Sequence, residues 1–257
     1  MTVRDRWQVA AGARASTKGA GYVEDDGLVA RLPPDAAAAL LALGERVEYA
    51  TGETVFREGD RDVRTALLLT GAVTVRTGGT AAEPTLLGVV CAGDLVGEMA
   101  PLDGNPRSAT VAACGPVTAR LIPQHRFLDV LDRHRALREE LARSVVARLR
   151  RANALRRDLP SRAETRVARV LVDLVTRLGH LEPDGSRTLD LPLTNVEVGS
   201  LAGLKRRSAE HAFAALREAG VVRAGTRRVI HVPDLSHLAT VAAGRRRQTT
   251  ARPAGLR

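Results

Sequence analysis

Two neighbouring groups of residues in the first half of the chain can hold a sugar phosphate. Gly93-Asp-Leu-Val-Gly97-Glu98-Met99 and Arg107-Ser108-Ala109-Thr110 combine glycines, a carboxylate, a guanidinium and a hydroxyl between apolar runs. Glycines let backbone N–H groups approach an anion, and a short helical turn after Gly97 would point its N–H groups at that anion. Glu98 can accept a hydrogen bond from a sugar hydroxyl, while Arg107 and Ser108 can donate to a phosphate. The alternative is an Arg–Glu ion pair that closes a sheet loop.

The surrounding sequence predicts a sandwich or barrel-like roll of short strands. Turn residues such as Gly52, Gly71 and Gly104-Asn105 separate β-type runs at intervals of roughly eight to twelve residues, which argues against a parallel sheet. A short helix with proline at its start is expected within Leu32–Leu43. The expected strands are Arg46–Tyr49, Thr54–Arg57, Thr65–Thr70, Ala72–Thr77, Thr85–Cys91, Ser108–Ala113 and Val117–Pro123.

A long helix is expected after this roll, because Arg126–Asp158 contains no glycine or proline. Its apolar residues recur at three- and four-residue steps and form one stripe: Leu137, Leu141, Val145, Leu149, Ala152, Leu155 and Leu159. A narrow stripe flanked by arginines favours a self-pairing coiled-coil seam, and the alternative is a helix facing the core of a single globule. Pro160 would end this helix, and Ser161-Arg-Ala-Glu164 predicts a capping box for the next one. We expect a domain boundary and a hinge at Pro160–Ser161.

A helix-turn-helix pattern follows in the last third of the chain. Thr194 with Glu197 predicts a capping box, Gly203 a tight turn, and Lys205-Arg206-Arg207 the start of a second helix. Val221–Arg223 and Arg228–Val232 are the expected strands of a wing. A basic start is where a recognition helix meets bases and phosphates; a solvated basic helix end is the alternative.

Residues 24 to 243 contain three features in sequence: the glycine–arginine turn from Gly93 to Thr110, the long helix and the helix-turn-helix. This order resembles the cyclic-AMP receptor protein / FNR (Crp/Fnr) family of bacterial regulators. The resemblance implies an α+β chain. Its expected parts are a flexible arm (1–23), a cyclic-nucleotide-binding β-roll or jelly-roll (24–133), a dimerisation helix (134–159), a winged helix-turn-helix (160–243) and a basic tail (244–257). It also implies a homodimer that binds a palindromic operator in double-stranded DNA, with RNA polymerase as a further candidate partner.

The resemblance assigns roles within the glycine–arginine turn, which we call the cassette (residues 93–110). It assigns the phosphate to Arg107 and to the backbone around Gly97 and Ser108–Ala109, and the ribose to Glu98. With three residues of the long helix, the candidate ligand-binding residues are Gly97, Glu98, Met99, Arg107, Ser108, Ala109, Arg151, Ala152 and Asn153.

The long helix departs from the family where the base would be bound. The cyclic-AMP receptor protein carries a Thr-Ser pair that contacts the adenine amine, whereas the matching positions here are Arg151 and Ala152, with Asn153 beside them. Arg151 cannot accept from that amine, although it can stack on a ring or donate to a guanine carbonyl. The resemblance makes cyclic AMP the leading ligand. Because the adenine contacts are missing, cyclic GMP, another anionic effector or no ligand are the alternatives.

The resemblance also assigns the DNA-reading residues. Arg206 matches an arginine that in relatives contacts guanine bidentately, and Arg207 stands where many relatives carry a glutamate that accepts from cytosine. Since arginine cannot accept, the operator should differ from the best-known half-site at that position. His211 falls at another base-reading position, and Lys205 replaces a capping serine while adding a phosphate contact. The candidate DNA-binding residues are Thr194, Lys205, Arg206, Arg207, Ser208, His211, Arg227 and Arg228.

Composition agrees with a DNA-binding regulator in the cytoplasm. The net charge of +10 is distributed as +3 over residues 1–23, −6 over 24–134 and +13 over 135–257. Cys91 and Cys114 lack metal-ligand spacing, so we expect buried thiols, no iron–sulfur cluster and no metal. No apolar run approaches the ~20 residues of a membrane span, and the N-terminus lacks a secretory pattern.

Three other classes of function are weighed against this one. A metal-dependent barrel enzyme needs histidine ligands within the strands, but all six histidines follow them, and no Ser-His-Asp or Cys-His arrangement is suggested, so we expect no enzyme. A regulator that needs no effector, or senses another metabolite, would keep the DNA-reading residues. A nucleotide-binding module whose helix-turn-helix contacts protein would bind no DNA through Arg206 and Arg207.

Overall fold

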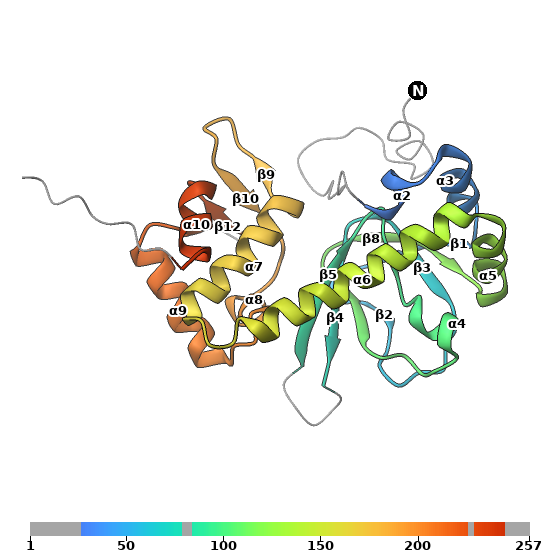
Figure 1. Cartoon of the computed structure of the whole chain (residues 1–257), viewed down its shortest axis with the longest axis horizontal. Coiled ribbons are helices and arrows are strands. Elements are labelled where there is room, and N and C mark those ends of the chain that lie inside the picture. The colour runs from blue at the N-terminus through green and yellow to red at the C-terminus, as the bar shows by residue number, and fades with distance from the viewer. Residues whose placement is uncertain (1–26, 79–83, 226–228, 245–257) are drawn as a thin grey trace, which may run out of the picture.

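The computed structural model describes residues 27–78, 84–225 and 229–244. An N-terminal roll and a C-terminal domain (residues 161–244), which we call the reading head, lie side by side, and helix α6 (Arg135–Arg157) passes from one to the other (Figure 1). The expected arm and almost all of the expected basic tail lie outside the described residues. Among the helices that the structure describes, none is both long and apolar enough to cross a bilayer.

The roll contains two four-stranded antiparallel sheets. The first has the order β1-β8-β3-β6: β1 (Glu45–Tyr49), β8 (Val117–Ile122), β3 (Thr65–Thr70) and β6 (Leu95–Val96). The second has the order β2-β7-β4-β5: β2 (Thr54–Phe56), β7 (Thr110–Ala113), β4 (Ala72–Thr77) and β5 (Thr85–Cys91). The predicted roll is confirmed, and only the short β6 was not expected, because two residues before a glycine show no alternation.

Strand β3 separates two cores and is buried on both faces. Ala66 and Leu68 face the interior of the roll, whereas Leu67 and Leu69 belong to a second core outside it. Four helices contribute to that second core: α2 (Leu28–Arg31), α3 (Pro34–Leu41), α5 (Gln124–Arg133) and the first two turns of α6. The cassette contains β6 and ends at the first residue of β7, so both sheets position it.

The predicted long helix is interrupted at His134. Helix α5 ends at Arg133 and α6 begins at Arg135, because His134 has an extended backbone (φ −119°, ψ 93°). No glycine or proline marks this break, so the lack of these residues over Arg126–Asp158 gave no sign of it, while α6 lies within the expected dimerisation helix of residues 134–159. The break lets α5 cover the roll while α6 takes a separate direction (Figure 1).

The reading head combines four helices with a small sheet of order β11-β12-β10-β9. The helices are α7 (Ala163–Leu178), α8 (Asn195–Leu201), α9 (Arg206–Glu218) and α10 (Leu235–Ala242), and the strands are β9 (His180–Leu181), β10 (Arg187–Leu189), β11 (Arg223–Ala224) and β12 (Ile230–Val232). Strands β11 and β12 are the predicted wing, and β9 and β10 extend it.

The predicted capping box at Ser161–Glu164 is absent from α7. Arg162 occupies the N-cap and no side chain caps the helix. Ser161 is engaged otherwise, because its N–H donates to Asp158 O (2.8 Å) and its hydroxyl accepts from Arg169 (3.4 Å).

The reading head packs on the second sheet of the roll. Arg76 Nη2 of β4 lies 2.6 Å from Glu197 Oε1 of α8, and the N–H of Leu86 donates to Ser200 Oγ (3.1 Å). Helix α8 thereby covers the free edge of β5. The core of the reading head continues into the roll residues Ala72, Leu86, Val89, Cys91 and Cys114.

Candidate nucleotide cassette and DNA-reading surface

Gly97 allows the cassette to fold back on Arg107. Its φ is +75°, which favours glycine. A Cβ at this position would lie 2.6 Å from Phe56 Cε2 and 2.7 Å from Arg107 Nη1, so no other residue fits without displacing them. The chain then forms the short helix α4 (Met99–Asp103) before it reaches Arg107. The predicted glycine therefore has a definite steric role.

The guanidinium of Arg107 is almost completely buried, with 3% of the side chain exposed. Nη1 donates to Gly97 O (2.6 Å), Nη2 donates to Arg64 O (2.5 Å), and Cζ lies 3.7 Å from the ring centroid of Phe56. Nε is buried without a hydrogen-bond partner among the described residues. Burial, together with the charge of Arg64, lowers the pKa of Arg107, while the carboxylate of Asp62 opposes that shift.

A second ion pair borders Arg107. Asp62 Oδ1 lies 3.5 Å from Arg107 Nη2, and both oxygens of Asp62 accept hydrogen bonds from Arg64. Burial by itself would raise the pKa of Asp62, but the hydrogen bonds from Arg64 and the charges of Arg64 and Arg107 outweigh it, so the pKa lies below its ordinary value. Local sequence patterns gave no sign of Phe56, Asp62 and Arg64, because they precede Arg107 by more than forty positions.

Glu98 connects the cassette to α6. It is 2% exposed, and its Oε1 lies 2.5 Å from Arg148 Nη1. Arg148 Nη2 also donates to Leu95 O (2.8 Å). Arg148 was not predicted; the available signal is its position two turns after the buried Leu141, on the helix face that continues toward the roll.

The other predicted ligand residues differ in exposure. Ala109 is buried, whereas Met99 and Ser108 are exposed and touch through Ser108 Oγ and Met99 Sδ (3.8 Å). On α6, Ala152 is half-buried, and Arg151 and Asn153 are exposed. Arg148, not Arg151, is the α6 arginine that hydrogen-bonds to the cassette.

The apolar stripe of α6 turns away from the roll along its length. Leu137 and Leu141 are buried against the roll, but Val145 is 40% and Leu149 57% exposed. At 3.6 residues per turn, each four-residue step rotates the stripe by about 40°. Its second half, with Val146 beside it, therefore leaves an apolar surface exposed in the single chain.

The helix-turn-helix forms as predicted. Thr194 and Glu197 make the reciprocal capping box of α8, and Gly203 has φ +66° in the turn. A Cβ on Gly199 would lie 2.2 Å from Ala209 Cβ, so this glycine brings α8 and α9 close together. Arg166 of α7 donates to Gly203 O (3.0 Å) and holds the turn.

The start of α9 presents a basic surface. Lys205 is the N-cap without a side-chain cap bond, and Lys205, Arg206, Arg207, Ser208 and His211 are all exposed. The opposite face of α9 is buried in the reading head through Ala209, Ala212, Phe213 and Leu216. Arg227 and Arg228 lie outside the described residues.

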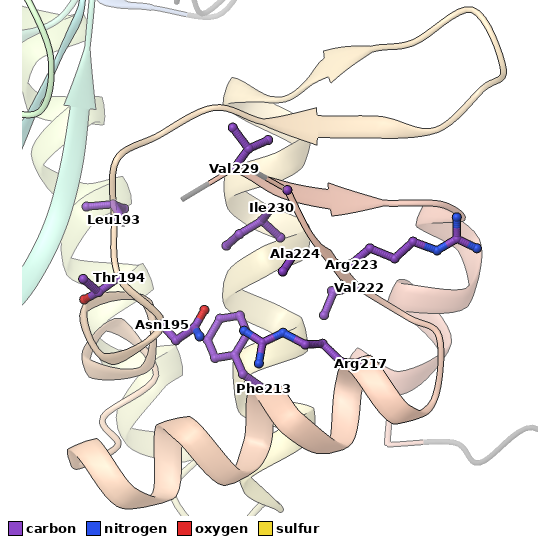
Figure 2. A pocket seen from close by; sticks show the side chains of 11 residues that line it. Leu193, Thr194, Asn195, Phe213, Arg217, Val222, Arg223, Ala224, Val229 and Ile230 are labelled. Carbon is purple, nitrogen blue, oxygen red and sulfur yellow. The ribbon is translucent and has the colours of Figure 1, made fainter. Parts of the chain in front are cut away.

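A cavity of about 290 Å³ lies between α9, the start of α8 and the wing (Figure 2). The ring of Phe213 forms its floor, with the guanidinium of Arg217 5.7 Å from the ring centroid and Asn195 on the other side (Figure 2). Thr194 and Ile230 also line it. This cavity belongs to the reading head and not to the cassette.

The described residues contain no cluster of three or more histidine, cysteine or carboxylate side chains placed to hold a metal ion. Cys91 and Cys114 are buried, and neither takes part in a disulfide bond. Burial raises the pKa of Cys114 to about 12; Glu197 adds to this shift and Arg76 opposes it.

Comparisons with known proteins match both halves of the molecule. Residues 46–134 match the family model of the cyclic nucleotide-binding domain, and residues 165–241 match the Crp-like helix-turn-helix domain. The chain is 28% identical over 214 residues to the CRP-like cAMP-activated global transcriptional regulator of Mycobacterium tuberculosis, covering 83% of this chain and 95% of that protein. It is 29% identical over 197 residues to the cyclic AMP receptor protein of Thermus thermophilus, covering 76% and 87%.

Solved structures share the fold. A CRP/FNR-family transcriptional regulator from Thermus thermophilus aligns with a TM-score of 0.65 at 24% identity, covering 78% of this chain and all of that one. FixK2 from Bradyrhizobium japonicum aligns with a TM-score of 0.66 at 19% identity, covering 77% and 97%. The roll and the helix-turn-helix thus define a DNA-binding transcriptional regulator with a cyclic nucleotide-binding domain. The chain belongs to the Crp/Fnr family of transcriptional regulators.

Proposed function

We propose that the protein acts as a homodimer whose affinity for a specific DNA sequence is controlled by a cyclic nucleotide, with cyclic AMP as the leading ligand. The contact between Glu98 and Arg148 carries this proposal, because it links the cassette to the helix that leads to the reading head. The names of the Mycobacterium tuberculosis and Thermus thermophilus relatives, which refer to cyclic AMP, support the choice of ligand.

In the proposed complex, Arg107 binds the phosphate and Glu98 the ribose. The remaining cassette residues Gly97, Met99, Ser108 and Ala109 surround the phosphate, and the base lies toward Arg151, Ala152 and Asn153 of α6. The buried and incompletely bonded guanidinium of Arg107 supports an anionic ligand.

The exposed apolar surface of α6 supports dimerisation. Val145, Val146 and Leu149 lie on one side of the helix and remain 40%, 47% and 57% exposed in the single chain. Pairing with the same surface of a second copy would bury them along a two-fold axis.

The exposed start of α9 supports binding in the major groove. In the proposed complex, Arg206, Arg207 and His211 read base edges, and Lys205, Ser208 and Thr194 lie near the phosphates. A two-fold dimer would present two such helices to half-sites roughly 34 Å apart, which requires a palindromic operator. A ligand that favours one arrangement of the two α6 helices would change this spacing and hence the DNA affinity.

Calorimetric titration with cyclic AMP and cyclic GMP tests the ligand. We expect Arg107→Lys to lose most of the affinity of the native chain, since lysine lacks the two-pronged guanidinium. Arg57→Lys, at an exposed arginine directly after β2, is the matched control and should bind normally. No binding of either nucleotide by the native chain would contradict the proposal.

Fluorescence anisotropy with an operator selected from random DNA tests whether the nucleotide controls DNA binding. Nucleotide should strengthen binding, and Arg206→Ala should weaken it by about 1–3 kcal/mol, whereas Arg150→Ala on α6 should not. DNA affinity that is the same with and without nucleotide would favour a regulator that needs no effector. Two observations favour a regulator that needs no effector. Arg107 already donates to backbone carbonyls within the protein, and residues 151 and 152 carry no hydroxyl.

A further inference from the structure

The loop between β2 and β3 holds Arg107 through its backbone and its side chains. Gly59 N donates to Arg107 O (2.9 Å), and Arg107 N donates to Asp60 O (2.8 Å). Arg107 Nη2 donates to Arg64 O, the Arg64 side chain holds both oxygens of Asp62, and Asp62 lies beside Arg107 Nη2. The three residues form a closed ring of contacts at the cassette, in which Arg64 contributes its backbone carbonyl as well as its side chain.

Two guanidinium groups share one carboxylate in this ring. Arg64 Nη2 lies 2.6 Å from Asp62 Oδ2, whereas Arg107 is 3.5 Å from the nearest oxygen and keeps a buried, unbonded Nε among the described residues. Glu98 already pairs with Arg148, and Asp60 is exposed and exerts the weakest pull of the three carboxylates around Arg107. The charge of Arg107 is therefore only partly compensated, which matches one additional monoanion such as a cyclic phosphodiester.

We infer that Asp62 is the internal counter-ion of Arg107 and determines how tightly the cassette holds a cyclic phosphate. The inference rests on the proposed function of the cassette. In the free protein, the carboxylate stabilises the buried guanidinium, because an unpaired buried charge is costly. In the complex, the same carboxylate lies close to the phosphate and repels it. Asp62 thus increases the stability of the free protein and decreases its affinity for ligand.

The contacts that orient Arg107 do not require the charge of Asp62, whose Oδ1 also accepts from the N–H of Arg64 (2.9 Å), a bond that an amide oxygen can keep. The carbonyls of Gly97 and Arg64 accept from its two terminal nitrogens, and the ring of Phe56 lies against it. Asp62→Asn removes the charge, keeps nearly the same shape and leaves these three contacts in place. The variant therefore separates the counter-ion effect from a loss of positioning.

The test compares the native chain, Asp62→Asn and the control Asp129→Asn, which removes a carboxylate that pairs with Arg133 on α5. Without ligand, Asp62→Asn should melt about 3 °C below the native chain. Inorganic phosphate should raise the melting temperature of Asp62→Asn more than that of the native chain. In calorimetric titration with cyclic AMP and cyclic GMP, Asp62→Asn should bind the preferred nucleotide on the order of fivefold more tightly. Asp129→Asn should match the native chain in both measurements.

Equal or weaker nucleotide binding by Asp62→Asn, in a native chain that does bind, overturns the inference. If neither form binds a nucleotide, the proposed function fails while the counter-ion role is still decided by melting. A lower melting temperature of Asp62→Asn that phosphate restores then supports it, and an unchanged melting temperature overturns it.

Discussion

Two glycines near Arg107, one in the cassette and one in the loop between β2 and β3, differ in what surrounds them. Gly97 and Gly59 have similar backbone conformations, with φ +75° and +84°. A Cβ on Gly97 meets Phe56 and Arg107, whereas a Cβ on Gly59 has no neighbour within 4 Å. The two positions therefore separate backbone strain from steric conflict.

Gly97→Ala is expected to destabilise the protein by about 3 kcal/mol, because it adds overpacking at Phe56 and Arg107 to the cost of a positive φ. Gly59→Ala should cost only about 1 kcal/mol, for backbone strain alone. Urea unfolding of both variants measures the difference. Equal losses for the two variants would show that the contact between Gly97 and Arg107 is not tight.

At the scale of the element, α6 serves two surfaces in succession. Leu137 and Leu141 attach its start to the roll, Arg148 ties its middle to the cassette, and Val145 and Leu149 face outward. The same apolar stripe thus changes partner along one helix, which is the geometry expected where a dimer seam follows a packed segment.

Leu149→Arg is expected to convert a dimer into a monomer. In a symmetric seam, the substitution places two like charges near the two-fold axis and removes two buried leucines. Light scattering after size-exclusion chromatography measures the mass. The control is Leu181→Arg in β9, a leucine that is similarly exposed but lies in the reading head. A dimer that persists in Leu149→Arg would place the subunit contact elsewhere.

Helix starts show how far a local pattern can be trusted. The Ser/Thr-x-x-Glu pattern occurs at both Ser161 and Thr194, but only Thr194 forms the box with its glutamate. Ser161 is held by the end of α6 and by Arg169, so neighbouring structure overrides the local preference.

At the scale of the whole molecule, the reading head and the roll share one core. Arg76 and Glu197 pair across the boundary, Ser200 accepts from the edge of β5, and Cys114 lies in the shared core. Arg169 also bonds Asp158 (2.7 Å) and Ser161 across the predicted hinge at Pro160. Any swing of the reading head must break or rearrange these contacts.

Arg76→Glu is expected to loosen this packing, because it opposes two carboxylates where an ion pair stood. The thiol of Cys114, with a pKa of about 12, should alkylate very slowly at about pH 8 in the native chain. Because Arg76 lowers the pKa of Cys114, losing its charge alone would raise that pKa further and slow alkylation. Faster alkylation of Arg76→Glu can therefore come only from separation of the reading head from the roll.

Peptide-level mass spectrometry follows Cys114 separately from Cys91 in this experiment. Arg46→Glu, on β1 of the other sheet, is the charge-matched control and should react at the native rate. An unchanged rate for Cys114 in Arg76→Glu would mean that the shared apolar core holds the two parts together without the ion pair.

Local patterns were sufficient for much of this protein. Alternation, turn chemistry and apolar context within a few residues predicted the strands of the roll, the capping box at Thr194 and the buried cysteines. The order of these patterns along the chain also led to the family.

Tertiary structure alone decided which side chains meet. The residues around Arg107 come together because β2 pairs with β7, and they are Phe56, Asp62 and Arg64. Arg148 contacts Glu98 because α6 passes beside the cassette. Packing of α8 against β5 likewise joins elements more than a hundred residues apart. Periodicity reports which face of an element is apolar, but the partner of that face depends on the free energy of packing the whole chain.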